Sequence, residues 1–157
     1  MMVMYTHFAD LDSRLIVLSC IEDANTLTCV VTIVSKTGRC PKCQYGSHKR
    51  HSAYMRVIDD LPIQGKSVQL YLKTHKWFCT NSFCEAKVFT ERFEWLLPHR
   101  QRTVRLDAAL RVIAFSTNCI EAAHVTRMLG MPVSHDTLLR LIHTTEMPTV
   151  HSPFYRH

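Results

Sequence analysis

The chain has 157 residues, of which 46% are apolar and 20% are charged. This composition allows one domain or two small ones with a hydrophobic core, and it excludes a disordered chain. The 19 lysines and arginines outnumber the 13 aspartates and glutamates, so the formal charge of +6 favours a polyanionic partner. No apolar run approaches the roughly 18 residues of a membrane helix, and no secretory signal begins the chain. We therefore expect a cytoplasmic protein with no membrane partner.

Two runs of aliphatic and β-branched residues, 15–22 and 27–35, flank a polar turn at 23–25. Runs of this kind around a short polar turn predict a β-hairpin. Cys20 and Cys29 lie inside the two runs. Because the cytosol disfavours disulfides, we expect both to be unpaired core residues.

Residues 40–89 alternate between turn signals and short β-like runs. Turns are expected at 46–47 and at 61–65, where glycine and proline occur. Strands are expected at 68–72, where apolar and polar residues alternate, and at 76–78. This region therefore predicts several short strands.

Helical periodicity begins after Pro98. The first helix is expected over 103–117 and the second over 120–129, each with one apolar stripe. The expected stripe of the first helix is Leu106, Leu110 and Ile113. That of the second is Ala122, Val125, Met128 and Leu129.

A third helix is expected over 135–143, with Ser134 as its N-cap and Gly130 ending the helix before it. Its expected core face holds Leu138, Leu141 and Ile142, and its opposite face holds Asp136, Arg140 and His143. Two amphipathic helices joined by a glycine-containing turn are typical of a helix-turn-helix, although an ordinary helical hairpin has the same periodicity. In the first case Arg140 contacts guanine or a phosphate in the major groove.

Four cysteines have the spacing of metal ligands: Cys40 and Cys43 with two residues between them, and Cys79 and Cys84 with four. Two such turns brought together form a tetrahedral four-thiolate site, so we expect one structural Zn²⁺. Four protein ligands leave no position for water, which excludes a catalytic role for this ion.

Three other interpretations of these cysteines remain open from sequence alone. All four thiols can be small buried residues, or Cys40 and Cys43 can form a redox pair, which more often begins a helix. A nearby histidine, His48, His51 or His75, can also replace one sulfur ligand.

The positive charge is concentrated around these cysteines. Residues 40–106 contain 12 of the 19 basic residues but only five of the 13 acidic ones. A basic segment of this kind supplies sequence-independent phosphate contacts, although a solvated basic surface has the same composition.

Taken together, these motifs resemble the ISL-three family of insertion-sequence transposases. The resemblance covers roughly residues 40–142 in consistent order. Its matching stretches are Cys40–Cys43, Ser52–Tyr54, Arg56, Asp60–Pro62, Gly65, Phe78–Cys79, Cys84, Phe89, Glu91–Arg92, Arg102–Thr103, Arg105–Leu106, Leu129–Ser134 and Thr137–Arg140. It implies a DNA-binding half that recognises the terminal inverted repeats of a mobile element.

In such transposases a catalytic domain follows, in which three carboxylates hold two divalent metals. Here the chain ends near the point where that domain would begin, so the resemblance implies a non-enzymatic half. The acidic residues nearest to the cysteines do not form a substitute triad. Asp59 and Asp60 are adjacent in an expected loop, and Glu85, Glu91 and Glu94 are explained by solvation and ion pairing.

The sequence therefore predicts an α+β protein in three parts. Residues 1–97 form a β-hairpin and a zinc-ribbon-like β domain, 98–145 form a three-helix helix-turn-helix segment, and 146–157 form a linker or tail. Its expected partner is double-stranded DNA, with no small-molecule substrate; a homodimer or a full-length transposase is left open as a protein partner. The expected DNA contacts are Lys49, Arg50, Lys73, Lys76, Arg100, Arg102, Arg105, Ser134, His135, Asp136, Thr137 and Arg140.

Three other functions remain as alternatives. A zinc-stabilised module can bind a protein partner and inhibit a full-length transposase, and in that case Arg140 is dispensable. A metal-dependent nuclease would cleave DNA with Mg²⁺. RNA binding would use Tyr54, Tyr71 and Trp77 as stacking platforms, although aromatic residues at strand spacing more often lie in a core.

Overall fold

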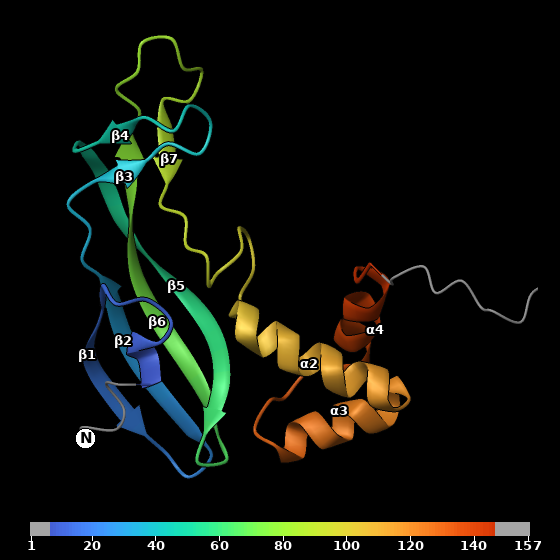
Figure 1. Ribbon diagram of the computed structural model, residues 1–157. Coiled ribbons are helices and arrows are strands. Elements are labelled where there is room, and N and C mark those ends of the chain that lie inside the picture. The colour runs from blue at the N-terminus through green and yellow to red at the C-terminus, as the bar shows by residue number, and fades with distance from the viewer. Residues whose placement is uncertain (1–6, 147–157) are drawn as a thin grey trace, which may run out of the picture.

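The computed structural model describes residues 7–146, with strands in the first two thirds of the chain and helices in the last third (Figure 1). The strands are β1 (Leu15–Glu22), β2 (Thr26–Ile33), β3 (Gly38–Arg39), β4 (Gly46–Ser47), β5 (Arg50–Ile63), β6 (Lys66–Phe78) and β7 (Val88–Thr90). The helices that follow them are α2 (Val104–Ser116), α3 (Cys119–Met128) and α4 (His135–His143). The α+β class is confirmed. From residue 147 onward the predicted tail lies outside the described residues.

The main sheet is mixed and has the strand order β1-β2-β6-β5, with β7 also paired to β6. Strands β1 and β2 are antiparallel and form the predicted N-terminal hairpin. β2 then runs parallel to β6, while β5 and β6 form a second antiparallel hairpin. The β5–β6 hairpin therefore runs along the length of the sheet. Strands β3, β4 and β7 lie at one end of this hairpin, and the helices lie beside its other end (Figure 1).

The prediction of several short strands between residues 40 and 89 is right for β4 and β7 and wrong for the two strands between them. Strands β5 and β6 have 14 and 13 residues and pair almost continuously until a tight turn at Gln64 and Gly65. The residues expected in a loop, Asp59 and Asp60, lie inside β5. The reason is tertiary: β6 is paired on both sides, and this pairing overrides weak local turn signals.

One face of the sheet carries the main hydrophobic core. Its strand residues include the fully buried Ile58, Leu70 and Leu72. Residues from outside the strands cover them, namely Phe8, Phe93, Trp95 and Leu96.

The expectation that Cys20 and Cys29 are unpaired is also wrong. They face one another across β1 and β2, and their sulfurs form a disulfide. Cys29 is fully buried, as expected for a core residue. Strand register, which is set by the whole hairpin, brings the two thiols together.

The three helices begin and end close to the predicted residues. Thr103, Asn118 and Ser134 are their N-caps, and each side chain accepts a hydrogen bond from a backbone N–H of the first helical turn. Leu106, Leu110, Leu138 and Leu141 are buried as predicted.

The predicted apolar stripe of α3 is right for the buried Ala122 and wrong for its other three residues. Met128 is 73% exposed, and Val125 and Leu129 are exposed as well. Beside Ala122, α3 buries Ala123 and Thr126, which were not predicted. Small side chains let α3 approach its neighbours closely, and this packing, rather than hydrophobicity alone, selects the buried face.

The helices are joined to the sheet by hydrogen bonds at the start of α2. The N–H of Asp59 donates to the carbonyl of Gln101, and the N–H of Thr103 donates to the carbonyl of Asp59, at 2.8 and 3.0 Å. The buried carboxylate of Asp60 also accepts hydrogen bonds from Thr103 Oγ1 at 2.7 Å and from Arg105 Nε at 2.9 Å. These bonds fix the start of α2 against β5.

A second contact joins the α3–α4 turn to the β5–β6 turn. Gly130 has a φ of +80°, and a Cβ at this position would lie 2.9 Å from the carbonyl oxygen of Gly65. Only glycine combines this backbone conformation with so close an approach. Between residues 7 and 146, no helix is long and apolar enough to cross a membrane.

Candidate metal centre

The first cysteine pair lies in the turn between β3 and β4. In this turn the N–H of Gln44 donates to the carbonyl of Cys40 at 2.8 Å, and the N–H of Cys40 donates to the carbonyl of Tyr45 at 3.0 Å. Gln44 has a φ of +60°, which closes the turn. This folding points the sulfurs of Cys40 and Cys43 in one direction.

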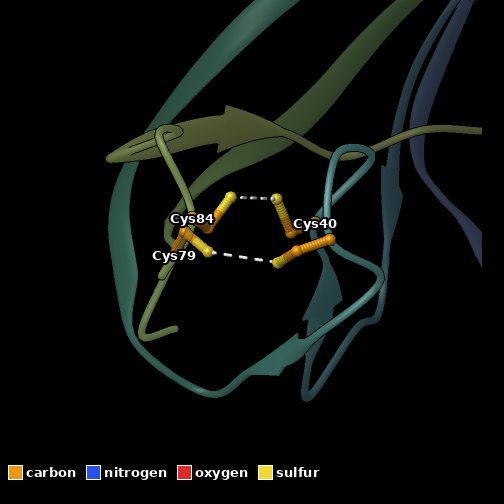
Figure 2. A group of neighbouring side chains, drawn as sticks. Cys40, Cys79 and Cys84 are labelled. Atoms are coloured by element: carbon orange, nitrogen blue, oxygen red, sulfur yellow. Dashed lines mark hydrogen bonds between the residues drawn. The ribbon is translucent and has the colours of Figure 1, made fainter. Parts of the chain in front are cut away.

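The second cysteine pair follows β6. The N–H of Cys79 donates to the carbonyl of Lys87, which brings the chain back toward β7. Within the turn, Asn81 accepts from the N–H of Cys84 through its carbonyl and from that of Phe83 through its side chain. Figure 2 shows Cys79 and Cys84 facing Cys40 across a gap bounded by sulfur atoms.

The four Sγ atoms have the spacing of a tetrahedral zinc site. The distance is 4.0 Å between Cys40 and Cys84 and 3.6 Å between Cys43 and Cys79, and all four sulfurs lie within 4.8 Å of one another. Zn–S bonds of about 2.3 Å place tetrahedral sulfurs about 3.8 Å apart. The four cysteines therefore fit one structural zinc ion.

A small aromatic core supports this site. Trp77 is fully buried and Phe89 is nearly so, and both pack with the cysteines. The backbone of Gly38 lies directly against the indole ring of Trp77. A Cβ at this position would be only 2.5 Å from that ring. A side chain at position 38 would displace Trp77 and, with it, the floor of the metal site.

The thiols differ in acidity. The backbone N–H of Tyr45 donates to Cys43 and lowers the pKa of this thiol to about 7. The backbone N–H of Asn81 also favours a Cys79 thiolate, but burial and the neighbouring sulfurs outweigh it and raise the pKa of Cys79 to about 12. Four thiolates require the charge of a metal ion.

The geometry supports neither a histidine ligand nor a redox pair of Cys40 and Cys43. Among the described residues, the group that gathers potential ligand atoms consists of four sulfurs and no histidine nitrogen. His48 and His51 are exposed, and His75 lies beside the Trp77 ring. Cys40 and Cys43 form no disulfide and lie in a β-turn instead of at the start of a helix.

Comparison with known families agrees with this geometry. Residues 36–84 match the family model described as the zinc-finger of transposase IS204/IS1001/IS1096/IS1165, which spans both cysteine pairs. This segment is similar to a transposase zinc ribbon. The match confirms the predicted family for residues 36–84 and leaves the helices outside it. No curated protein and no solved structure matches the chain.

Basic side chains surround the zinc ribbon. Lys49, Arg50 and Lys76 lie over the rings of Phe78, Trp77 and Tyr54, respectively, with 5.1–5.4 Å between the cationic group and the ring centre. Arg50 also donates to the carbonyl of Ser35 at 2.7 Å. Lys73 is exposed further along β6.

Two of the arginines predicted to contact DNA are bound by carboxylates of the protein. Arg105 makes a bidentate pair with the buried Asp60. Arg102 donates from Nε to Asp107 at 2.7 Å. The structure therefore gives Arg105 a clear internal role, because its Nε and one Nη atom are directed at Asp60.

The structure also brings four predicted contact residues into one recess, formed by the loop before α2 and by α4. Arg100 and Arg102 line it from the loop, and Thr137 and Arg140 line it from the helix. Sequence analysis missed His99 and Thr144, which line the same recess. The position of His99 next to Arg100 was the available signal. Nothing in the sequence pointed to Thr144.

The other predicted residues lie at the start of α4. Ser134 caps the helix by accepting a hydrogen bond from the N–H of Thr137 at 3.2 Å. His135 and Asp136 are exposed, and 3.3 Å separates His135 Nε2 from Asp136 Oδ1. Ser134 therefore has a structural role, and its two neighbours remain open to a partner.

Proposed function

We propose that this chain binds the double-stranded terminal inverted repeats of a mobile DNA element, as the DNA-binding half of a transposase. The observation that carries the proposal is the match of the four-cysteine segment to a transposase zinc finger. In this proposal residues 1–97 form the zinc-binding unit and 98–145 the helix-turn-helix unit. A transposase half of this kind would work on DNA in the bacterial cytosol, alone, as a homodimer or with a full-length transposase.

The helices supply the second support. α3 and α4 are joined by the turn at Gly130, and α4 buries Leu138 and Leu141 while its opposite side is exposed. This arrangement suits a helix-turn-helix in which α4 enters the major groove. The exposed residues of α4 then include Asp136, Arg140 and His143.

The proposed function is binding without cleavage. Asp59 and Asp60 point to opposite faces of β5, and Asp60 is taken up by Arg105. Within residues 7–146, the group of three or more potential ligands found near one point consists of the cysteines. Both observations favour a chain that holds DNA while a separate carboxylate site performs the chemistry.

The test is the salt dependence of duplex binding by the zinc-loaded chain. Fluorescence anisotropy should give an affinity for inverted-repeat DNA that falls steeply between about 50 and 200 mM salt, because phosphate binding releases counterions. A scrambled duplex should bind more weakly, and Mg²⁺ should produce no cleavage. Binding that is absent, or insensitive to salt, would contradict the proposal.

A protein partner is the second candidate, and exposed apolar side chains on the helices favour it. Val112 on α2 is 68% exposed, and Ile120 and Met128 on α3 are each 73% exposed. Replacing Ile120 and Met128 with serine should then abolish association with the partner while DNA binding persists. Arg140→Ala should have the opposite effect.

A further inference from the structure

The recess between the loop before α2 and helix α4 has a volume of about 280 Å³. Three arginines line it: Arg100 and Arg102 from the loop and Arg140 from the helix. No acidic residue is among its lining residues. Asp107 offsets the charge of Arg102, but no carboxylate among the described residues pairs with Arg100 or Arg140, so an anion in the recess would reduce the repulsion between these guanidinium groups.

The donors of these arginines are largely unused. Arg102 donates to Asp107 through Nε only, and the Nη atoms of Arg102 have no hydrogen-bond partner within residues 7–146. The side chains of Arg100 and Arg140 form no hydrogen bond or ion pair with the described residues. Two hydroxyl-bearing residues, Thr137 and Thr144, complete the polar lining.

The backbone on both sides of the recess is fixed. On the loop side, Arg56 donates from Nη2 to the carbonyl of Arg100 at 2.7 Å, and the N–H of Arg100 donates to the carbonyl of Leu97. On the helix side, Leu141 is buried in the helical core, which sets the rotation of α4. A site with a fixed backbone binds its ligand at a lower entropic cost.

We propose that this recess binds one phosphate group of the DNA backbone, held jointly by the loop arginines and by Arg140. The proposal rests on the proposed function and deepens it. Guanidinium groups match the oxygens of a phosphate through paired N–H donors, and hydroxyl groups can donate to the same oxygens. Arg140 therefore fixes the register of α4 on the duplex instead of reading a base.

This assignment differs from base recognition in what it predicts for sequence preference. An arginine bound to guanine gives discrimination at one base pair, whereas an arginine bound to phosphate contributes equally on every sequence. In addition, loop and helix residues that bind the same phosphate should not act independently.

The experiment compares Arg100→Ala, Arg140→Ala and the double variant in the full zinc-loaded chain, on inverted-repeat and scrambled duplexes. Each single change should weaken binding about tenfold on both duplexes and lower the salt slope by about one. The double variant should lose less than the roughly hundredfold product of the two. Lys36→Ala, an exposed charge that does not line the recess, is the matched control and should have little effect.

Three results would overturn the phosphate assignment while the wild-type chain still binds DNA: unchanged affinity in both single variants, losses confined to the inverted repeat, or strictly additive losses. Far-UV circular dichroism and zinc content identify any variant that has not folded, and Arg140→Lys then replaces it with an expected intermediate loss. If the wild-type chain binds no DNA, the proposed function fails first.

Inorganic phosphate separates the two possible sources of this chemistry. At matched ionic strength, it should compete only weakly with duplex DNA, and it should shift the NMR signals of Thr137 and Thr144. If inorganic phosphate shifts these signals but duplex DNA does not, the recess serves a free phosphate and the assignment to the DNA backbone is wrong.

Discussion

Single carboxylates decide how the basic residues of this protein are used. Asp60 and Asp107 each bind an arginine at the start of α2, so Arg105 and Arg102 are oriented by the protein itself. Arg100 and Arg140 have no such partner among the described residues, and Arg102 keeps its Nη atoms free, so these three arginines can bind an anion. The number of basic residues therefore overstates the number of side chains that are free to bind an anion.

Asp60→Asn should destabilise the fold by roughly 3 kcal/mol. The change leaves the Arg105 guanidinium without its charge partner beside a buried strand, and breaking a buried ion pair is costly. Urea unfolding would measure the effect. Glu22→Gln removes the exposed pair with Lys66 and is the matched control, whose loss of stability should be much smaller because solvent screens the pair. Equal losses in the two variants would contradict the role of Asp60.

The helices and the sheet are joined by two contacts. The α3–α4 turn rests on the β5–β6 turn through Gly130 and Gly65, while β5 holds the start of α2. Strand pairing and helix packing thus place α4 at a fixed distance from the zinc ribbon.

Gly130→Ala should cost about 2 kcal/mol. About half of this loss of stability comes from placing alanine at a positive φ. The rest comes from the close contact of the new Cβ with the carbonyl oxygen of Gly65. The midpoint of urea unfolding would show this loss. Gly46→Ala is the matched control, since a Cβ there meets nothing within 4 Å, and its effect should stay below about 0.5 kcal/mol. A neutral Gly130→Ala would show that the two turns do not press together.

At the scale of the whole molecule, three cores stabilise three regions. The sheet, the helices and the zinc ribbon each have their own cluster of buried residues. The ribbon cluster is the smallest and contains the metal ligands, so its stability depends most on the ion.

Removing zinc with a chelator should unfold the ribbon and leave the helices in place. In a Trp95→Phe variant, Trp77 is the only tryptophan, and its emission should shift to the red as its surroundings open. The circular dichroism signal of the helices should change little. Loss of both signals together would show that the three cores unfold as one unit.

Zinc binding should also weaken as the pH falls, because protons compete with the metal for the thiolates. The Cys43 thiol, with a pKa of about 7, loses its proton more readily than the Cys79 thiol, whose pKa is raised to about 12, so protons compete strongly with the metal at Cys79. Between pH 8 and pH 6 the apparent zinc affinity should therefore drop, as a competition assay with a chelator would show. An affinity independent of pH would argue against thiolate ligands.

The sequence by itself determined the features that depend on local chemistry. The spacing of Cys40, Cys43, Cys79 and Cys84 predicted the metal site, Ser134 predicted a helix start, and Gly130 predicted a helix end. These signals work because a chelating turn or a helix cap involves residues only a few positions apart.

Only the tertiary structure decided the rest. The length of β5 and β6, the disulfide between Cys20 and Cys29, and the buried face of α3 all depend on neighbours distant in sequence. The same holds for the arginines, since Asp60 lies 45 residues before Arg105, and Arg100 lies far along the chain from Arg140. Burial and charge pairing are properties of surroundings in space, and these surroundings exist only once the chain has folded.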